Sequence, residues 1–190
     1  MHIEYEVRVL NINENEIIKK IRRQGGEKIA DYNYRRKVYD FKPAKKNKWI
    51  RLRTDGLKTT LTVKEIEKKT IDGTRELEVE VSDFMETDRI LNELGYVAKS
   101  YQENKRKRFV LGGVEIDIDS WPYIPTYLEI EGKSEEDVMK IVEMLDLKDN
   151  DVTPDDVQSI YLDYYKIDIT KMDNMTFDTV LDEKYKIKDK

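Results

Sequence analysis

Short segments in which charged and apolar side chains alternate recur along almost the whole chain, and they limit the possible folds more than any other feature. The first is Ile3-Glu4-Tyr5-Glu6-Val7-Arg8-Val9. Successive side chains point to opposite faces of a β-strand, so each segment would have one ionic and one apolar face. The ionic faces would meet either bulk water, as in an ordinary sheet, or one another around an enclosed space. The alternation returns at residues 49–53, 60–64, 76–81, 114–119 and 127–131.

The composition indicates one globular domain that uses an unusual number of charged residues. Of the 190 residues, 38% are apolar and 39% are charged, whereas roughly a quarter are charged in typical proteins. The formal net charge of -5 argues against a general nucleic-acid binder, although a local basic site is compatible with it. We expect a single domain at residues 1–168 and a C-terminal extension at 169–190 that is partly frayed.

Missing residue types exclude several kinds of site. The chain has no cysteine, which excludes disulfides and thiolate zinc sites. Its single histidine is His2, so histidine-based acid-base chemistry has little support. Oxygen atoms would therefore have to hold any bound metal ion. No apolar run approaches the roughly 20 residues that span a bilayer, and the N-terminus lacks a signal-peptide pattern, so we expect a cytoplasmic protein.

Helix signals separate the strand-like segments. Polar N-cap residues and following glycines delimit a helix from Asn13 to the Gly25-Gly26 pair and another from about Asp83 to Leu94. Further helices are predicted at 135–145 and from Thr153-Pro154 to about Tyr165, where proline would occupy the first helical position. Strands are predicted near 3–9, 36–41, 49–54, 58–65, 75–81, 105–111, 114–119 and 126–131.

Two details favour enclosed ionic faces, although alternation alone would favour an ordinary sheet with one wet face. Most strands carry one sign of charge on their polar face, and like charges bring no benefit on a solvated strand. The basic residues at these positions are mostly arginine, whose planar fork binds phosphate oxygens in pairs and keeps its charge. They are Arg8, Arg51, Arg53, Lys64, Arg106 and Arg108.

The acidic positions indicate a hard divalent cation. A Glu-x-Glu pair places two carboxylates on one strand face about 6 to 7 Å apart, and two facing pairs would repel unless a cation lay between them. Because only oxygen ligands are available, we expect Mg²⁺ or Mn²⁺. If the strands close with these faces inward, the interior is a wet tunnel that a metal ion and a polyanion balance, because desolvating unpaired ions is costly. The acidic set is Glu4, Glu6, Glu76, Glu78, Glu80, Asp117, Asp119, Glu129 and Glu131.

The ordered series of these segments resembles the CYTH domains, or triphosphate tunnel metalloenzymes. The N-terminal strand of that family reads Glu-x-Glu-x-Lys, and Glu4-Tyr5-Glu6-Val7-Arg8 is similar to it, with arginine in place of lysine. The resemblance extends to about residues 3–165. It includes the Arg-x-Arg strand at 51–53, the Lys64 strand, Glu76 and Glu78, the basic strand with Arg106 and Arg108, and the acidic strands at 117–119 and 127–131. It implies an α+β fold, an eight-stranded antiparallel β-barrel closed as a tunnel, with amphipathic helices packed outside.

The resemblance also implies roles for individual residues. Family members act on triphosphates with Mg²⁺ or Mn²⁺. Arginine is a poor proton acceptor, so Arg8 would bind phosphate without serving as a general base, and catalysis would depend on the metal and on electrostatic stabilisation. The resemblance implies metal binding at Glu4, Glu6, Asp117, Asp119, Glu129 and Glu131; triphosphate binding at Arg8, Arg51, Arg53, Lys64, Arg106 and Arg108; catalysis at Glu4, Glu6, Arg8 and Lys64; and further tunnel carboxylates at Glu76 and Glu78.

Three functions compete for this chain. The leading one is a metal-dependent hydrolase of a small triphosphate, such as inorganic triphosphate, thiamine triphosphate or a nucleoside triphosphate. The alternative is a class IV adenylyl cyclase, which would form cyclic AMP and pyrophosphate from ATP in the same tunnel. A module that only binds polyphosphate is disfavoured, because an anion receptor gains nothing from so many carboxylates. The expected partner is the small-molecule triphosphate; we expect neither a membrane nor nucleic acid, and we allow for a homodimer.

Overall fold

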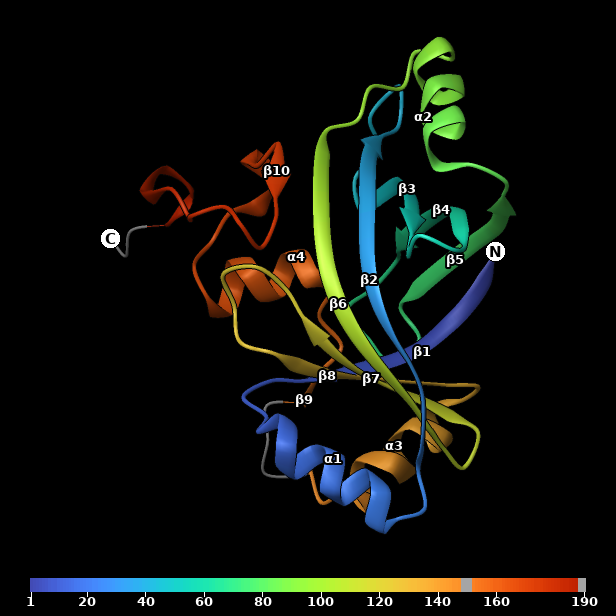
Figure 1. The fold of residues 1–190 in the computed structure, drawn as a ribbon, viewed down its shortest axis with the longest axis vertical. Coiled ribbons are helices and arrows are strands. Elements are labelled where there is room, and N and C mark those ends of the chain that lie inside the picture. Colours follow the sequence, from blue (N-terminus) through green and yellow to red (C-terminus); the bar gives the residue numbers. More distant parts are fainter. Residues whose placement is uncertain (148–151, 188–190) are drawn as a thin grey trace.

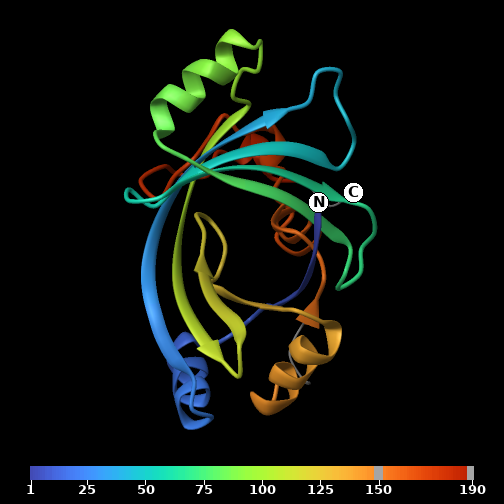
Figure 2. The ribbon, with the colours of Figure 1, turned by 90° about the vertical axis from the view of Figure 1, so that its right-hand side faces the viewer.

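Eight antiparallel strands close a barrel in the computed structural model, which describes residues 1–147 and 152–187 (Figure 1). Neighbouring strands follow the order β6-β2-β3-β4-β5-β1-β8-β7, and β7 pairs with β6 to complete the ring. Figure 2 shows how the strands curve around a common axis. This confirms the predicted fold class. The strands are β1 (His2–Val9), β2 (Glu27–Asp40), β3 (Lys48–Thr54), β4 (Thr59–Ile66), β5 (Thr74–Val81), β6 (Ser100–Leu111), β7 (Val114–Ser120) and β8 (Tyr127–Gly132).

Three helices pack outside the barrel and begin where the sequence predicts. The side chains of Asn13, Asp83 and Ser134 each accept a hydrogen bond from the backbone N–H three residues further on, which satisfies a donor that the first helical turn leaves free. Figure 1 shows α1 and α3 beneath the barrel and α2 at its top. The helices are α1 (Glu14–Arg23), α2 (Phe84–Glu93) and α3 (Glu135–Met144).

Helices cover the apolar outer faces of several strands, whereas Leu77 and Val79 on the outer face of β5 are exposed. Ile116 of β7 and Leu128 and Ile130 of β8 are fully buried against Ile21 of α1 and Ile141 of α3. On the other side of the barrel, α2 covers a second apolar cluster on β2 and β3. Because side chains alternate along a strand, burying the apolar faces outside turns the charged faces toward the barrel interior.

Two strands are longer than predicted. β2 begins at Glu27 instead of residue 36, β6 begins at Ser100 instead of residue 105, and the two pair along most of their length. The first half of β2 has no apolar face that would reveal it: Tyr34 is buried on the interior face, and the residues that alternate with it, Asn33 and Arg35, are exposed. Alternation of apolar and charged residues therefore detected only the end of this strand.

The predicted fourth helix is wrong in its start and in its extent. α4 spans only Val157–Ser159 with Asp156 as its N-cap, and a π-helical turn follows at Ile160–Tyr164. Thr153 lies instead in the short strand β9 (Val152–Thr153), which pairs with β1. The Thr153 hydroxyl accepts a hydrogen bond from the backbone N–H of Asp155, and this local turn competes with a helix start.

The described part of the C-terminal extension packs against one end of the barrel. The short strand β10 (Asn174–Met175) pairs in parallel with β6, and Met172 and Met175 are buried together with Trp121 and Tyr127. Partial fraying is predicted within residues 169–190; of these, residues 183–185 form a helical turn and Lys186 pairs with Ile167, while residues 188–190 lie outside the described residues. Within residues 1–147 and 152–187, no helix is long and apolar enough to cross a membrane.

Candidate functional site

The charged residues that the sequence placed on strand faces come together inside the barrel. Lys64 of β4 lies 2.9 Å from Glu4 of β1, although β5 separates these strands. A side chain reaches past a neighbouring strand only on the concave face of a curved sheet, so these residues line the interior. Strand pairing places the rest of the predicted set on the same face: Glu6, Arg8, Arg51, Arg53, Glu76, Glu78, Arg106, Arg108, Asp117, Asp119, Glu129 and Glu131.

Arg106 gathers three of the predicted metal ligands. Its guanidinium lies 2.5 Å from Asp117, 2.5 Å from Asp119 and 2.7 Å from Glu129, and all four side chains are buried. Although burial opposes the charge of Arg106, these carboxylates hold its pKa well above the usual value. The acidic walls of β7 and β8 therefore meet as predicted, but in this structure they meet around a guanidinium.

Arg8, where the chain departs from the lysine of the family pattern, connects three segments. Its Nη2 atom lies 2.9 Å from Glu6 and 2.8 Å from Glu129, and its Nη1 atom donates to the backbone carbonyl of Asp155 at 2.9 Å. A lysine ammonium is a compact point charge and lacks the fork that spans these positions. Arg8 thus ties β1 and β8 to the segment that leads into α4.

Lys64 joins the carboxyl groups of Glu4 and Glu76. Its Nζ atom lies 2.9 Å from Glu4 and 2.7 Å from Glu76. Burial raises the pKa of Glu4, and its hydrogen bond with Glu76 adds to the rise although Lys64 opposes it. Burial also acts to raise the pKa of Glu76, but Lys64 and Arg51 hold it below the usual value. The interior here holds more negative charge than its cations balance.

The remaining predicted residues lie along the same walls with different exposure. Arg51 contacts Glu76 at 3.2 Å and Glu78 at 3.3 Å, while the one carboxylate within ion-pair distance of Arg53 among the described residues is Glu78, at 3.7 Å. Arg108 lies 2.7 Å from both Glu115 and Asp117. Glu80, which the sequence also places in the acidic set, is exposed and pairs with Lys58, so it stands apart from the buried carboxylates.

The sequence did not identify Arg36, which is 7% exposed on the interior face of β2. Its Nη2 atom donates to Asn104, and its guanidinium lies 4.5 Å from the centre of the Trp121 ring. Among the described residues, no carboxylate lies within ion-pair distance of it. Burial lowers its pKa well below the usual value, and Arg51 and Arg53 add to that effect. The adjacent Arg35 and Arg36 obscured the alternation of charged and apolar residues on this strand. Tyr39 could have revealed the position of Arg36, because an apolar residue three positions along a strand points to the opposite, outer face.

The carboxylates fit a divalent metal in donor chemistry and in charge. Glu131 pairs with Glu6 across β1 and β8, and no cation among the described residues lies within ion-pair distance of it. Burial raises the pKa of Glu131 to about 7, and repulsion from Glu6 and Glu129 contributes. Such oxygen-only, cation-deficient surroundings suit Mg²⁺ or Mn²⁺. Within the part of the chain that the structure describes, no three carboxylates yet surround one ion position, since Arg8, Arg106 and Lys64 pair with them.

One end of the interior is covered by apolar and aromatic residues from three segments, here called the Trp121 cluster: Trp121, Tyr127, Ile160 and Tyr161. All four are buried. The Tyr161 hydroxyl donates to the Pro122 carbonyl at 2.5 Å. Trp121 Nε1 and the Tyr127 hydroxyl are buried and have no hydrogen-bond partner among the described residues, so the cluster contains two unsatisfied polar atoms.

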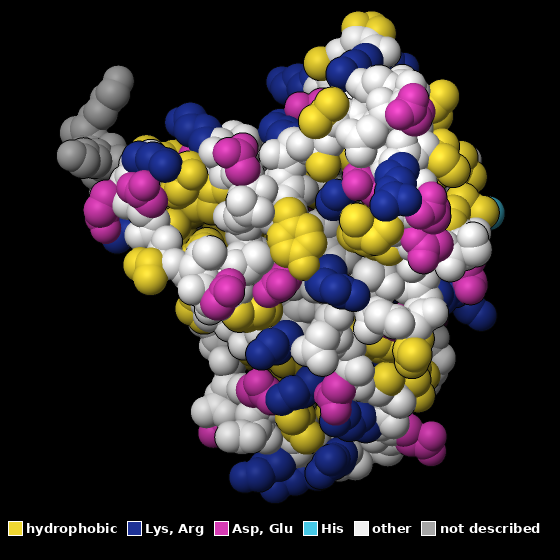
Figure 3. Space-filling model, turned by 45° about the horizontal axis from the view of Figure 1, so that its top comes forward, with side chains coloured by type: hydrophobic (Ala, Val, Ile, Leu, Met, Phe, Trp, Pro, Cys, Tyr) yellow, Lys and Arg dark blue, Asp and Glu magenta, His cyan; other side chains and the backbone are white. Residues whose placement is uncertain are grey.

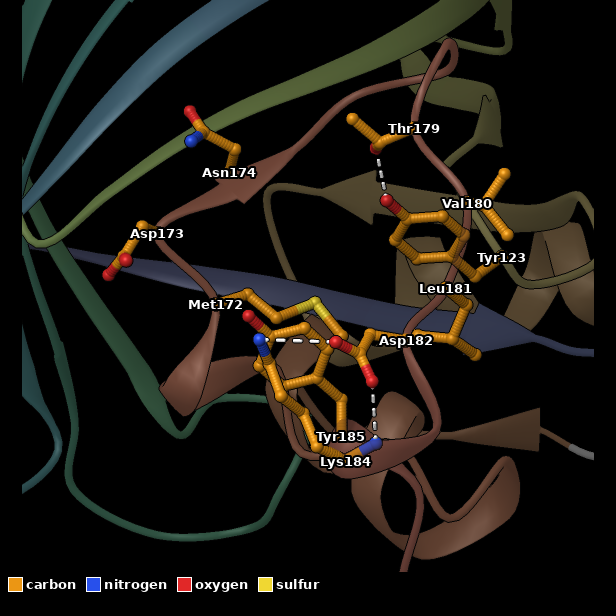
Figure 4. A pocket seen from close by; sticks show the side chains of 10 residues that line it. All are labelled: Tyr123, Met172, Asp173, Asn174, Thr179, Val180, Leu181, Asp182, Lys184 and Tyr185. Atoms are coloured by element: carbon orange, nitrogen blue, oxygen red, sulfur yellow. Dashed lines mark hydrogen bonds and ion pairs between the residues drawn. The ribbon is translucent and has the colours of Figure 1, made fainter.

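A separate cavity of about 260 Å³ lies outside the barrel, beside the C-terminal segment (Figure 4). The Tyr123 hydroxyl is hydrogen-bonded to Thr179 at its edge, and Lys184 pairs with Asp182 at 3.1 Å. Its polar groups thus satisfy one another. On the face shown in Figure 3, acidic and basic side chains are interspersed over the outer surface.

The sequence matches the CYTH domain model over residues 2–158. It matches no curated protein. A solved structure of a Pyrococcus horikoshii OT3 protein has 25% identity and a TM-score of 0.69, covering 80% of this chain and 96% of the other. A Pyrococcus furiosus protein has 23% identity and a TM-score of 0.70, covering 81% and 97%. An adenylyl cyclase candidate from Hippeastrum, described as having a dominant triphosphatase activity, has 14% identity and a TM-score of 0.56, covering 87% and 96%.

These similarities agree with the strand order and with the charged interior. The last two structures support the fold, and the family match includes all eight barrel strands from β1 to β8. The chain belongs to the CYTH domain family.

Proposed function

We propose that this protein is a divalent-metal-dependent phosphohydrolase that acts on a small triphosphate. One observation carries the proposal: among the described residues, a single closed interior leaves the buried Arg36 without a carboxylate and the half-buried Glu131 without a cation. Uncompensated buried charges are costly. A polyanion together with a divalent cation would neutralise both at once.

The interior residues divide into two proposed roles. Arg8, Arg51, Arg53, Lys64, Arg106 and Arg108 would bind phosphate oxygens, and Glu4, Glu6, Asp117, Asp119, Glu129 and Glu131 would hold Mg²⁺ or Mn²⁺. When bound, the ion would polarise the phosphoryl group and lower the pKa of a coordinated water. The guanidinium groups would stabilise the charge that develops on the phosphate oxygens and on the leaving phosphate. Arg8 would orient Glu6 and Glu129 and would not accept a proton, because guanidinium groups stay protonated.

The Hippeastrum protein supports phosphoanhydride chemistry for this barrel, since its description states a dominant triphosphatase activity. Cyclase chemistry is the second candidate, because the same protein is also described as an adenylyl cyclase candidate. Both reactions need the same phosphate-binding residues. They differ in the phosphorus atom that is attacked and in the attacking group, which is water in the hydrolase and the ribose 3′-hydroxyl in the cyclase.

A substrate panel tests the proposal. Inorganic tripolyphosphate, thiamine triphosphate and ATP are incubated with Mg²⁺, Mn²⁺ or EDTA, and phosphate, pyrophosphate and cyclic AMP are quantified. We expect phosphate release that depends on the metal. Formation of cyclic AMP and pyrophosphate from ATP would show that the protein is a cyclase and not a hydrolase. Absence of turnover with every substrate would reject both functions.

The double variant Glu4→Gln and Glu6→Gln provides the residue-level test. It keeps the side-chain volumes and removes two proposed metal ligands, so phosphate release should be abolished while the circular dichroism spectrum is unchanged. Glu80→Gln is the matched control: Glu80 lies on the neighbouring strand β5, is exposed and pairs with Lys58, so this variant should keep its activity. Full activity in the double variant would contradict the proposed role of β1.

A further inference from the structure

Carboxylates leave two interior cations largely unneutralised. Five others have a carboxylate oxygen within 3.2 Å: Arg8, Arg51, Lys64, Arg106 and Arg108. Among the described residues, Arg36 has none within ion-pair distance, and Arg53 has only Glu78, at 3.7 Å, whose side chain is 34% exposed. Arg36 and Arg53 are direct partners across β2 and β3. The described interior cations that lack a close carboxylate partner are therefore next to each other.

The residues around Arg36 present hydrogen-bond donors without acceptors. Arg36 Nε, Asn104 Nδ2 and Trp121 Nε1 are buried and have no hydrogen-bond partner among the described residues. The three side chains are in contact, because Arg36 donates to Asn104 Oδ1 and stacks on Trp121. Buried donors without partners are uncommon in folded proteins and carry a free-energy cost. An anion with several acceptor oxygens would satisfy all three.

This group of donors lies at a covered end of the interior. Asn104 is 1% exposed, Trp121 is 5% exposed, and Tyr161 of the Trp121 cluster is fully buried. Arg36 stacks on Trp121, which is buried in the same cluster as Tyr161. A chemical group bound beside Arg36 would therefore be the end of a ligand, with the remainder directed along the barrel toward Arg106 and the carboxylates.

We propose that Arg36, Arg53, Asn104 and Trp121 form a subsite for the free terminal phosphate of the substrate. A terminal phosphate brings two negative charges to two guanidinium groups and three oxygens to the unpartnered donors. This inference rests on the proposed function and narrows its substrate class. Triphosphates with an unsubstituted end fit, whereas a dinucleoside triphosphate, which is esterified at both ends, does not.

Binding of tripolyphosphate in EDTA tests the subsite without turnover. Calorimetry compares the wild type with Arg36→Gln and with Arg35→Gln, the matched control that removes the exposed arginine next to it. Arg36→Gln should weaken binding about 10- to 100-fold, as expected for charge-assisted hydrogen bonds, and Arg35→Gln should bind within about twofold of the wild type. Equal affinity of Arg36→Gln and the wild type would overturn the subsite even if the enzyme hydrolyses tripolyphosphate. Wild-type protein that does not bind tripolyphosphate and turns over no substrate of the panel would overturn the proposed function as well.

A second test uses wild-type protein only, so folding of a variant does not affect it. Diadenosine triphosphate and ATP are compared as ligands in EDTA, where the proposed metal-dependent hydrolysis does not consume them. ATP should bind at least tenfold more tightly, because only ATP presents a free terminal phosphate to the covered end. Comparable affinity for both would refute the subsite, while metal-dependent phosphate release from tripolyphosphate would still support the hydrolase.

Discussion

Lys64 Nζ lies 2.9 Å from the Glu4 carboxylate, although strand β5 stands between the two strands that carry them. The same ammonium lies 2.7 Å from Glu76 of that intervening strand. One buried cation thus joins three strands of the barrel wall. Removal of this cation would leave the Glu4 and Glu76 carboxyl groups without the partner that both contact.

Lys64→Met should therefore lower both stability and activity. Removing one partner of a buried ion pair typically costs about 3 to 5 kcal/mol, and urea unfolding at pH 7 measures the loss. Tripolyphosphate hydrolysis should fall at the same time, because a proposed phosphate ligand is gone. Lys58→Met, which removes an exposed ion pair with Glu80, is the control and should change stability little. A Lys64→Met variant as stable as the Lys58→Met control would show that the Glu4 and Glu76 carboxyls do not need this cation.

Asp88 of α2 should stabilise the fold in a pH-dependent way, away from the site. Lys37 lies 2.6 Å from it, and the Tyr39 hydroxyl donates to it at 2.8 Å. Burial acts to raise the pKa of Asp88, but these hydrogen bonds hold it below the usual 3.8. A lowered pKa means that the stabilisation is present above about pH 4 and is lost as the pH falls through the pKa of the folded state. Asp88→Asn should be about 1 to 3 kcal/mol less stable than the wild type at pH 7, and the two proteins should converge below pH 4.

The control for this prediction is Asp40→Asn, which removes an exposed ion pair with Lys99. Its unfolding free energy should follow that of the wild type across the same pH range. A constant difference between Asp88→Asn and the wild type from pH 7 to pH 3 would contradict the ionic role of Asp88.

Periodicity in the sequence predicted the barrel because its charged and apolar faces alternate clearly on most strands. It failed where that contrast is weak. The first half of β2 faces solvent on one side and mixed polar and aromatic side chains on the other. The sequence pattern therefore did not predict this part of the strand, and Arg36 was not identified. The helix signals at Thr153 failed because pairing of β9 with β1 and a local hydrogen bond prevailed over them. The sequence also could not show that Arg8, Arg106 and Lys64 pair directly with carboxylates, because strand phase gives the face of a residue and not its distance to another strand.

Glu131→Gln should weaken Mn²⁺ binding by about tenfold or more. Glu131 pairs with Glu6 across β1 and β8, and its carboxylate lacks a cation within ion-pair distance among the described residues. An amide oxygen is a weaker ligand for a hard divalent ion than a carboxylate. Calorimetric titration with Mn²⁺ measures the effect, and Glu80→Gln serves as the control. Unchanged Mn²⁺ affinity in Glu131→Gln would remove Glu131 from the proposed metal site.

Arg106→Met should be more damaging than Arg108→Met, although the two arginines alternate on the same strand. Arg106 holds Asp117, Asp119 and Glu129 in a buried cluster, whereas the Arg108 side chain is 22% exposed and one of its two partners is the exposed Glu115. Without Arg106, three buried carboxylates repel one another, and protonation or a divalent cation is the available relief. The urea midpoint of Arg106→Met should therefore rise relative to that of the wild type when the pH is lowered from 7 to 5 or when Mn²⁺ is added. If Arg106→Met and Arg108→Met lose equal stability and respond equally to Mn²⁺, the carboxylate cluster does not depend on Arg106, and its assignment as a metal-binding wall loses its main support.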